Sequence, residues 1–143
     1  EQYKYNGVTT LVDGLKGNEN FRSGRWIAWK DNDFEVLIDL KNSTTINEIA
    51  VNANVLQRSW LFGARSMQIF TSNDGTYFQL LAEDFYKPML ETDRDGIYEY
   101  KLNFPETKAR FVKLKVSTEK MLPSWHTGAG SSAFLFVDEI TLK

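Results

Sequence analysis

The stretch Phe34-Glu35-Val36-Leu37-Ile38-Asp39-Leu40 decides the fold class of this chain. In an extended chain alternate side chains point to the same face, so this stretch gathers four large apolar residues on one face: Phe34, Val36, Ile38 and Leu40. The two-residue period excludes an amphipathic helix here, because helical apolar faces recur every three to four residues. The stretch therefore predicts a β-strand with one buried face.

Other segments repeat this period, and turn-forming residues separate them. The further predicted strands are 46–51, 67–71, 77–81, 97–104, 111–116 and 133–142. The turn signals between them lie at 41–43, 72–75, 93–96 and 103–106, and Asp74-Gly75 predicts a hairpin. About eight short antiparallel strands, with no convincing helix or repeat, predict an all-β domain: a two-sheet sandwich of the jelly-roll type.

Composition sets the limits within which a function must be sought. The 143 residues are enough for one domain, 1–143, with its own core, and the absence of cysteine excludes disulfides and a thiol nucleophile. A net charge of −2, from 17 basic and 19 acidic residues, argues against nucleic acid and anionic membrane surfaces as partners. The first residues lack the apolar region of a signal peptide, so we interpret the chain as a mature or excised segment.

Four long segments without strand character are the candidate functional loops: 13–33, 53–64, 83–95 and 118–132. All four tryptophans lie in or beside them, and a tryptophan on a loop can stack on the apolar face of a sugar. We expect Trp29, Trp60 and Trp125 to form apolar platforms and Trp26 to plug one end of the sandwich. The alternative is that at least two of the four close the ends of the core.

Polar partners for a sugar are available on the same loops. Arg58 and His126 can donate hydrogen bonds to hydroxyl or acetamido groups. A hydrolytic triad would depend entirely on His126, the one histidine, and the chain has no Gly-x-Ser-x-Gly motif. We therefore predict a non-catalytic domain and assign no catalytic residue.

Two acidic residues interrupt an otherwise apolar strand near the end of the chain. Asp138 and Glu139 follow Ala133-Phe134-Leu135-Phe136-Val137, and a buried carboxylate is costly unless it is paired or bound to a cation. The loop beyond Asp13-Gly14 is rich in glycine and oxygen donors, as calcium sites are. From composition alone, a calcium site and a plain polar loop both remain open.

Several short motifs, taken in order, resemble the discoidin family, also called coagulation factor 5/8 type C domains. The motifs are Leu11-Val12-Asp13-Gly14, Gly24-Arg25-Trp26, Ser72-Asn73-Asp74-Gly75, Ala109-Arg110-Phe111-Val112-Lys113-Leu114 and Phe136-Val137-Asp138-Glu139-Ile140. Residues 20–26 and 125–130 look most like the domain at the C-terminal end of bacterial family 20 β-N-acetylhexosaminidases, which is similar to carbohydrate-binding module family 32. The resemblance spans essentially the whole chain and implies a galactose-binding-like jelly roll.

The resemblance also implies a structural calcium ion, Ca2+, near the two ends of the domain. Carried over by position, its ligands would be Thr10, Asp13, Leu15, Ser23 and Glu139. The family's threonine two residues before the tryptophan is Gly24 here, so Ser23 stands in for that ligand. For the sugar, Arg58 lies close to a family arginine and Trp125 could serve as the family aromatic, whereas Trp29 stands near the place of a family histidine.

With the loop tryptophans, the resemblance implies a carbohydrate-binding module attached to a glycoside hydrolase, of the β-N-acetylhexosaminidase or chitobiase type. Its partners would be a galactose or N-acetylhexosamine type glycan and the catalytic domain of the same polypeptide. The location would be extracellular, periplasmic or at the cell surface of a bacterium. The alternative is an accessory domain that braces the catalytic domain and binds no sugar, with Trp60 and Trp125 buried. A lipid-binding discoidin domain is a third interpretation, for which only Trp60-Leu61-Phe62 with its basic neighbours fits.

Overall fold

The computed structural model describes residues 27–30 and 33–143, which form six strands and one short 3-10 helix. The strands are β1 (Ile27–Lys30), β2 (Phe34–Val55), β3 (Ala64–Ser72), β4 (Gln79–Phe85), β5 (Gly96–Thr118) and β6 (Phe134–Leu142), and the 3-10 helix is η2 (Gln57–Ser59). Within these residues there is no α-helix, and none of the helical structure could cross a membrane. The prediction of an all-β domain is confirmed.

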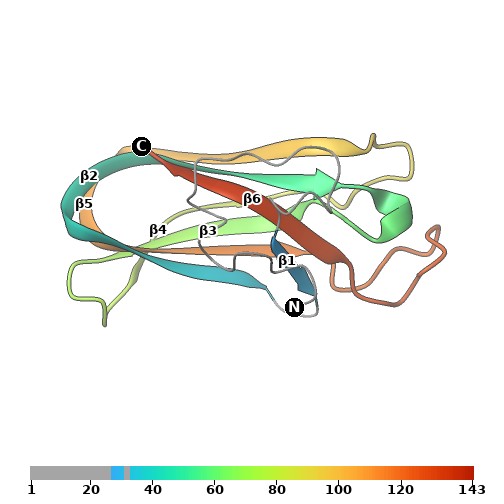
Figure 1. Ribbon diagram of the computed structural model, residues 1–143, viewed down its shortest axis with the longest axis horizontal. Coiled ribbons are helices and arrows are strands. Elements are labelled where there is room, and N and C mark those ends of the chain that lie inside the picture. Colours follow the sequence, from blue (N-terminus) through green and yellow to red (C-terminus); the bar gives the residue numbers. More distant parts are fainter. Residues whose placement is uncertain (1–26, 31–32) are drawn as a thin grey trace.

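All six strands belong to one antiparallel sheet that curls into two layers. The order of neighbours is β1-β6-β2-β5-β3-β4. The long strands β2 and β5 bend together at one end of the molecule, so that each contributes one half to either layer (Figure 1). The second half of β2 pairs with β6, whereas the second half of β5 pairs with β3. The result is the expected β-sandwich.

The bends replace two chain reversals that the turn signals predicted. Residues 41–43 lie inside β2 and residues 103–106 inside β5, where the ladder between the two strands shifts register but continues. Lys41 takes a positive φ of 71°, and its N–H donates to Asp39 Oδ1 at 2.8 Å. This local turn chemistry forms a bulge, which bends a strand without ending it. Four predicted strands are consequently joined in pairs: 34–40 and 46–51 lie in β2, and 97–104 and 111–116 lie in β5.

The core lies between the two layers and contains the apolar faces that alternation predicts. Phe34 is fully buried in a cluster that takes residues from both layers: Ile49, Met67, Ile69, Val112, Leu114, Leu135 and Val137. Val36, Ile38 and Leu40 pack against this cluster, while Leu37 on the opposite face is exposed. The face assigned to Phe34 from the sequence is therefore correct.

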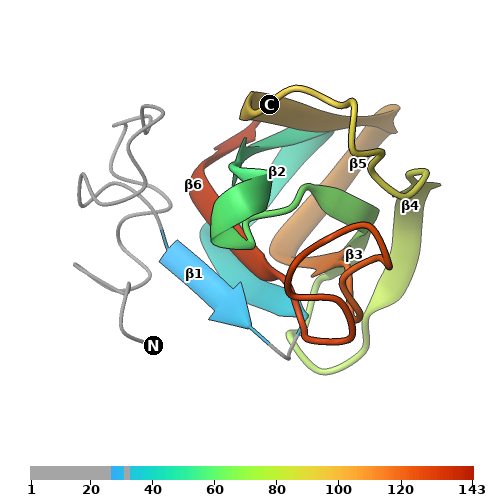
Figure 2. The same ribbon diagram turned by 90° about the vertical axis from the view of Figure 1, so that its right-hand side faces the viewer.

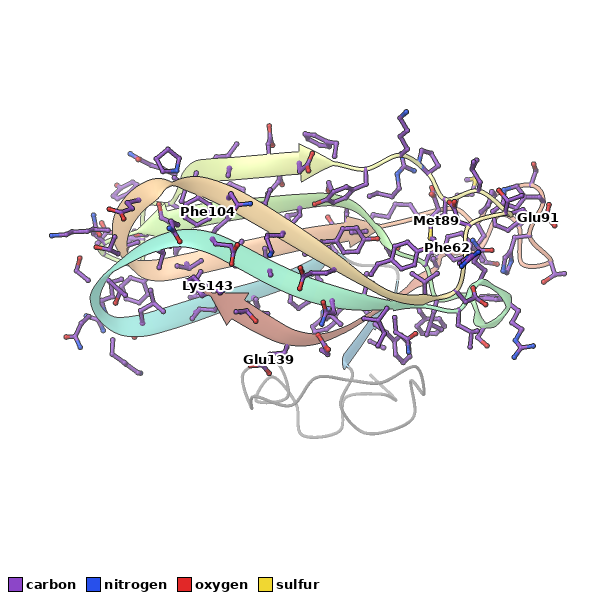
Figure 3. The ribbon with its side chains drawn as sticks, turned by 90° about the horizontal axis from the view of Figure 1, so that it is seen from above. Phe62, Met89, Glu91, Phe104, Glu139 and Lys143 are labelled. Atoms are coloured by element: carbon purple, nitrogen blue, oxygen red, sulfur yellow. The ribbon has the colours of Figure 1, made fainter. Side chains whose placement is uncertain are left out.

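The connections gather at the two ends of the sandwich. Residues 56–63, 86–95 and 119–133 lie together at one end, which we call the loop end (Figures 1 and 2). The β3–β4 hairpin, with Gly75 at a positive φ of 77°, lies at the other end beside the bends of β2 and β5. Figure 3 shows Phe62 and Met89 at the loop end and Phe104 toward the bend. Three of the four predicted functional loops thus converge.

Candidate functional site

The first loop of the loop end is closed by its own backbone. Leu56 and Leu61 exchange N–H to O bonds of 3.0 and 3.2 Å, with η2 and Trp60 between them. Trp60 has a positive φ of 68°, a left-handed turn that returns the chain toward β3. This geometry leaves Arg58 exposed at the tip of the loop and Trp60 half-buried.

Gln57 connects this loop to the other two. Its backbone N–H donates to Asp95 Oδ1 at 3.0 Å, and its side-chain Nε2 donates to Leu90 O at 3.0 Å. Its carbonyl oxygen accepts from His126 Nε2 at 2.5 Å. Because one residue bonds to residues 90, 95 and 126, the three loops form a single cross-linked unit.

His126 is buried within that unit, with only 7% of its surface exposed. Its Nδ1 accepts the backbone N–H of Gly128 at 2.8 Å, so the proton of the neutral ring is on Nε2, which donates to Gln57. Both nitrogens are thereby engaged by the backbone of the loops. A hydrogen bond from His126 to a sugar would require one of these bonds to break, so the structure gives His126 a positioning role.

An aromatic cluster lies beside His126. Phe62, 1% exposed, stacks on Trp125 with ring centroids 6.0 Å apart and an interplanar angle of 20°. Trp60 packs edge-on against His126, with the ring centroids 6.3 Å apart. Leu122, Ala133 and Met89 complete this cluster, in which Trp60 and Trp125 are half-buried. Both tryptophans therefore pack against the cluster and remain partly exposed.

A pocket of about 240 Å³ with polar groups in its lining opens at the loop end. Its lining consists of Asn54, Val55, Leu56, Arg58, Asp95 and Gly96. The guanidinium of Arg58 supplies donors and the carboxylate of Asp95 supplies acceptors, while the bond from Gln57 fixes the position of Asp95. The pocket thus offers both kinds of hydrogen-bonding group from two different loops.

Two tyrosines of β5 support the loop end. Burial raises the pKa of Tyr100 to about 12, and its hydroxyl lies directly against Gly63, where an added Cβ would be 2.2 Å from the oxygen. Burial, followed by the carboxylates of Asp93 and Asp95, raises the pKa of Tyr98, whose hydroxyl donates to Arg94 O at 2.5 Å. Both phenols are therefore neutral and protonated at physiological pH.

The remaining predicted site residues lie elsewhere. Trp29 is half-buried on β1 and packs edge-on against Phe34 at 4.5 Å, which places it on the main core instead of the Trp60–Trp125 cluster. Of the predicted calcium ligands, Thr10, Asp13, Leu15 and Ser23 lie outside the described residues, as does Trp26.

Glu139, the remaining predicted ligand, is half-buried on β6 (Figure 3). Its neighbour Asp138 is fully buried, and Asp138 Oδ2 accepts from Asn52 Nδ2 at 3.3 Å. Across residues 27–30 and 33–143, no three acidic or histidine side chains form a group that could hold a metal ion. The calcium site therefore stays a prediction from the sequence.

Sequence reasoning did not identify the residues that organise the loop end. Gln57 and Asp95 connect different loops, Gly128 holds His126 within its own loop, and Phe62 packs in the aromatic cluster. The turn signal at 93–96 indicated that Asp95 is in a turn, but nothing in the local pattern indicates which loop that turn contacts.

The curled antiparallel sheet, the cross-linked loops at one end and the small pocket there define a β-sandwich module with a loop-end pocket. The chain matches the F5/8 type C domain over residues 1–135 and belongs to this family. The resemblance inferred from the short motifs is therefore confirmed. A comparison with curated proteins gave no match.

Solved structures with the same fold include known carbohydrate-binding modules. CpGH89CBM32-5 from Clostridium perfringens, solved with GalNAc-β-1,3-galactose, is 18% identical with a TM-score of 0.57, covering 93% of this chain and 80% of that one. A pectin-binding module is 20% identical with a TM-score of 0.56, covering 100% of this chain and 84% of that one. The C-terminal domain of a chitobiase from Bacteroides fragilis is 19% identical with a TM-score of 0.53, covering 95% and 78%.

Proposed function

We propose that this domain is a non-catalytic carbohydrate-binding module, attached to a glycoside hydrolase that works outside the cell. The observation that carries the proposal is the loop end, where three cross-linked loops carry two half-buried tryptophans and two of these loops contribute Arg58 and Asp95 to a pocket. Structural neighbours solved with a glycan or described as pectin-binding support it. The chitobiase domain supports, more loosely, a parent enzyme acting on N-acetylhexosamines.

In this proposal the pocket recognises the hydroxyl groups of a terminal sugar. Arg58 donates to hydroxyl or acetamido oxygens, Asp95 accepts from hydroxyls, and the accessible parts of Trp60 and Trp125 contact C–H groups of the ring. The sugar exchanges hydrogen bonds with water for similar bonds with the protein, so each site binds weakly. Tethering to the enzyme or repeated modules would raise the effective affinity.

Replacing Arg58 is the direct test of this site. Arg58→Ala removes the charged donor of the pocket, and we expect about a tenfold loss of affinity, equivalent to about 1.4 kcal/mol for a charged hydrogen bond. A glycan array that includes galactosides and N-acetylhexosaminides selects the ligand, and calorimetry then compares the variants. Arg94→Ala, an exposed arginine at the same end that does not line the pocket, is the matched control and should bind normally.

The second candidate function is an accessory domain that braces the catalytic domain of the same polypeptide. The observation in its favour is that Trp60 and Trp125 pack within the aromatic cluster instead of standing free as platforms. Failure of the folded wild-type domain to bind any glycan on the array would contradict the first proposal and favour this one. If Arg58→Ala binds the glycan as tightly as the wild type, the sugar-binding site is not this pocket.

We also propose a structural calcium ion, with Glu139 as its ligand from β6. The support comes from the family resemblance and from Glu139 standing half-buried beside the fully buried Asp138. A bound ion stabilises the folded state by mass action, so a chelator should lower the melting temperature and added calcium should restore it. Glu139→Gln should abolish this response, and an unchanged wild-type melting temperature would contradict the site.

A further inference from the structure

A second pocket lies at the end opposite the loop end. Residues of the β3–β4 hairpin and of the bend of β5 line a pocket of about 310 Å³. Its principal lining residues are polar or aromatic: Asn73, Asp74, Tyr77, Gln79, Thr107 and Lys108. None of them lines the pocket beside Arg58, so the two pockets are separate.

The hairpin turn that forms one wall is held rigid by its own hydrogen bonds. Asp74 Oδ1 accepts the N–H groups of Thr76 and Tyr77 at 2.8 and 3.0 Å, and the hydroxyl of Ser72 at 2.9 Å. Gly75 has a positive φ and lies so close to Phe111 that an added Cβ would be 3.2 Å from its ring. A wall fixed in this way need not be ordered when a ligand binds, which lowers the cost of binding.

Tyr77 is the aromatic group of this pocket, and 80% of its surface is exposed. This exposure contrasts with Trp60 and Trp125, which are half-buried in the loop cluster. Among the described residues that line the two pockets, Tyr77 is the aromatic one, and its backbone N–H is bonded to the rigid turn. Such a ring is suited to contact the C–H face of a sugar.

The charges of the pocket are balanced. The backbone N–H groups of Tyr77 and Thr76, with the hydroxyl of Ser72, lower the pKa of Asp74, so its carboxylate is ionised at neutral pH. Lys108 is exposed, and within residues 33–143 no carboxylate lies within ion-pair distance of it. One negative and one positive group, with the amides of Asn73 and Gln79, provide both donors and acceptors for a neutral ligand.

We infer that this pocket is a second glycan-binding site, which takes a single neutral pyranose ring with its C–H face on Tyr77. Its volume is at the lower end of the range of about 300 to 1,000 Å³ that small-molecule sites occupy. Asp74 accepts from, and Lys108 donates to, neighbouring hydroxyls of the sugar. With the loop end, the domain would be bivalent, so that one module engages two chain ends of a glycan surface.

The experiment is a titration of the 15N-labelled domain with three probes, galactose, N-acetylglucosamine and glucuronate, followed by amide chemical shifts. Galactose or N-acetylglucosamine should shift amides at 73–79 and 107–108. Tyr77→Ala should weaken this binding about tenfold, the equivalent of an aromatic contact at the upper end of its usual value. Phe85→Ala, which removes a ring that is 67% exposed at the other end of β4, should leave these shifts unchanged.

The two ends report separately in this experiment. Loss of shifts at the loop end in Arg58→Ala, with hairpin shifts retained, would support two independent sites. If no probe shifts the hairpin amides, or if Tyr77→Ala leaves the affinity unchanged, the second site is refuted whatever happens at the loop end. Shifts with glucuronate alone would overturn the assignment of a neutral ligand.

Discussion

His126→Ala is expected to lower the free energy of unfolding by about 3 kcal/mol. The change removes the acceptor of the buried Gly128 N–H, and an unsatisfied buried donor costs about 1 to 3 kcal/mol. It also removes a buried ring and leaves a cavity. The centroid of that ring lies 5.6 Å from the ring centroid of Phe62 and 6.0 Å from that of Trp125. The carbonyl oxygen of Gln57 loses its bond from His126 but still accepts the backbone N–H of Trp60 at 2.9 Å, so it is not left without a donor.

Urea unfolding of the isolated domain measures this effect. Ser124→Ala, an exposed residue of the same loop, is the matched control and should change stability little. His126→Asn should recover part of the loss, because its side-chain oxygen can replace Nδ1 as the acceptor for Gly128. A loss for His126→Ala no larger than that for Ser124→Ala would show that the histidine does not hold the loops together.

Gly128→Ala is the second change with a large expected effect, about 2 kcal/mol of destabilisation. A Cβ at this position would lie 2.7 Å from Cε2 and Cζ2 of Trp60 and 3.1 Å from Leu122 Cδ1. Contacts this short force the indole or the loop to move, and overpacking of this kind costs about 1 to 3 kcal/mol. The glycine is therefore required by close packing against the tryptophan.

A double-mutant cycle distinguishes that mechanism from a general intolerance of the loop. In the background of Trp60→Ala the ring is gone, so Gly128→Ala should cost much less than in the wild type, and the two changes should be strongly non-additive. Thr127→Ala, at the exposed neighbouring position, serves as the control. Additive effects in the cycle would mean that Trp60 and Gly128 do not contact each other in solution.

Alternation was enough to predict the β-sandwich, because burial of one face is a property of each strand by itself. Phe34 with its same-face partners shows this directly, and Asp74-Gly75 correctly predicted a hairpin. The continuous strands β2 and β5 could not be predicted, because the residues that make a turn also make a bulge. Pairing with a strand far away in the sequence decides between the two, as the ladder on either side of Lys41 shows.

The sequence predicted where the candidate site lies but not the contacts that organise it. The sequence placed Arg58, Trp60, Trp125 and His126 on long loops, and the structure brings these four to one end. The hydrogen-bond partners of His126 follow from how separate loops pack on each other, which no local pattern encodes. The same holds for Gln57, whose polar side chain and backbone connect three loops without any motif.

The continuity of β2 and β5 has a consequence for how the domain opens. Because each strand crosses from one layer to the other, the sandwich has no seam along which one layer could separate while the other stays folded. β5 begins beside the Arg58 pocket, passes Thr107 and Lys108, and returns to the loop end at Thr118. One uninterrupted strand therefore connects the two ends. A sugar bound at either end would stabilise the folded state against the same cooperative unfolding transition.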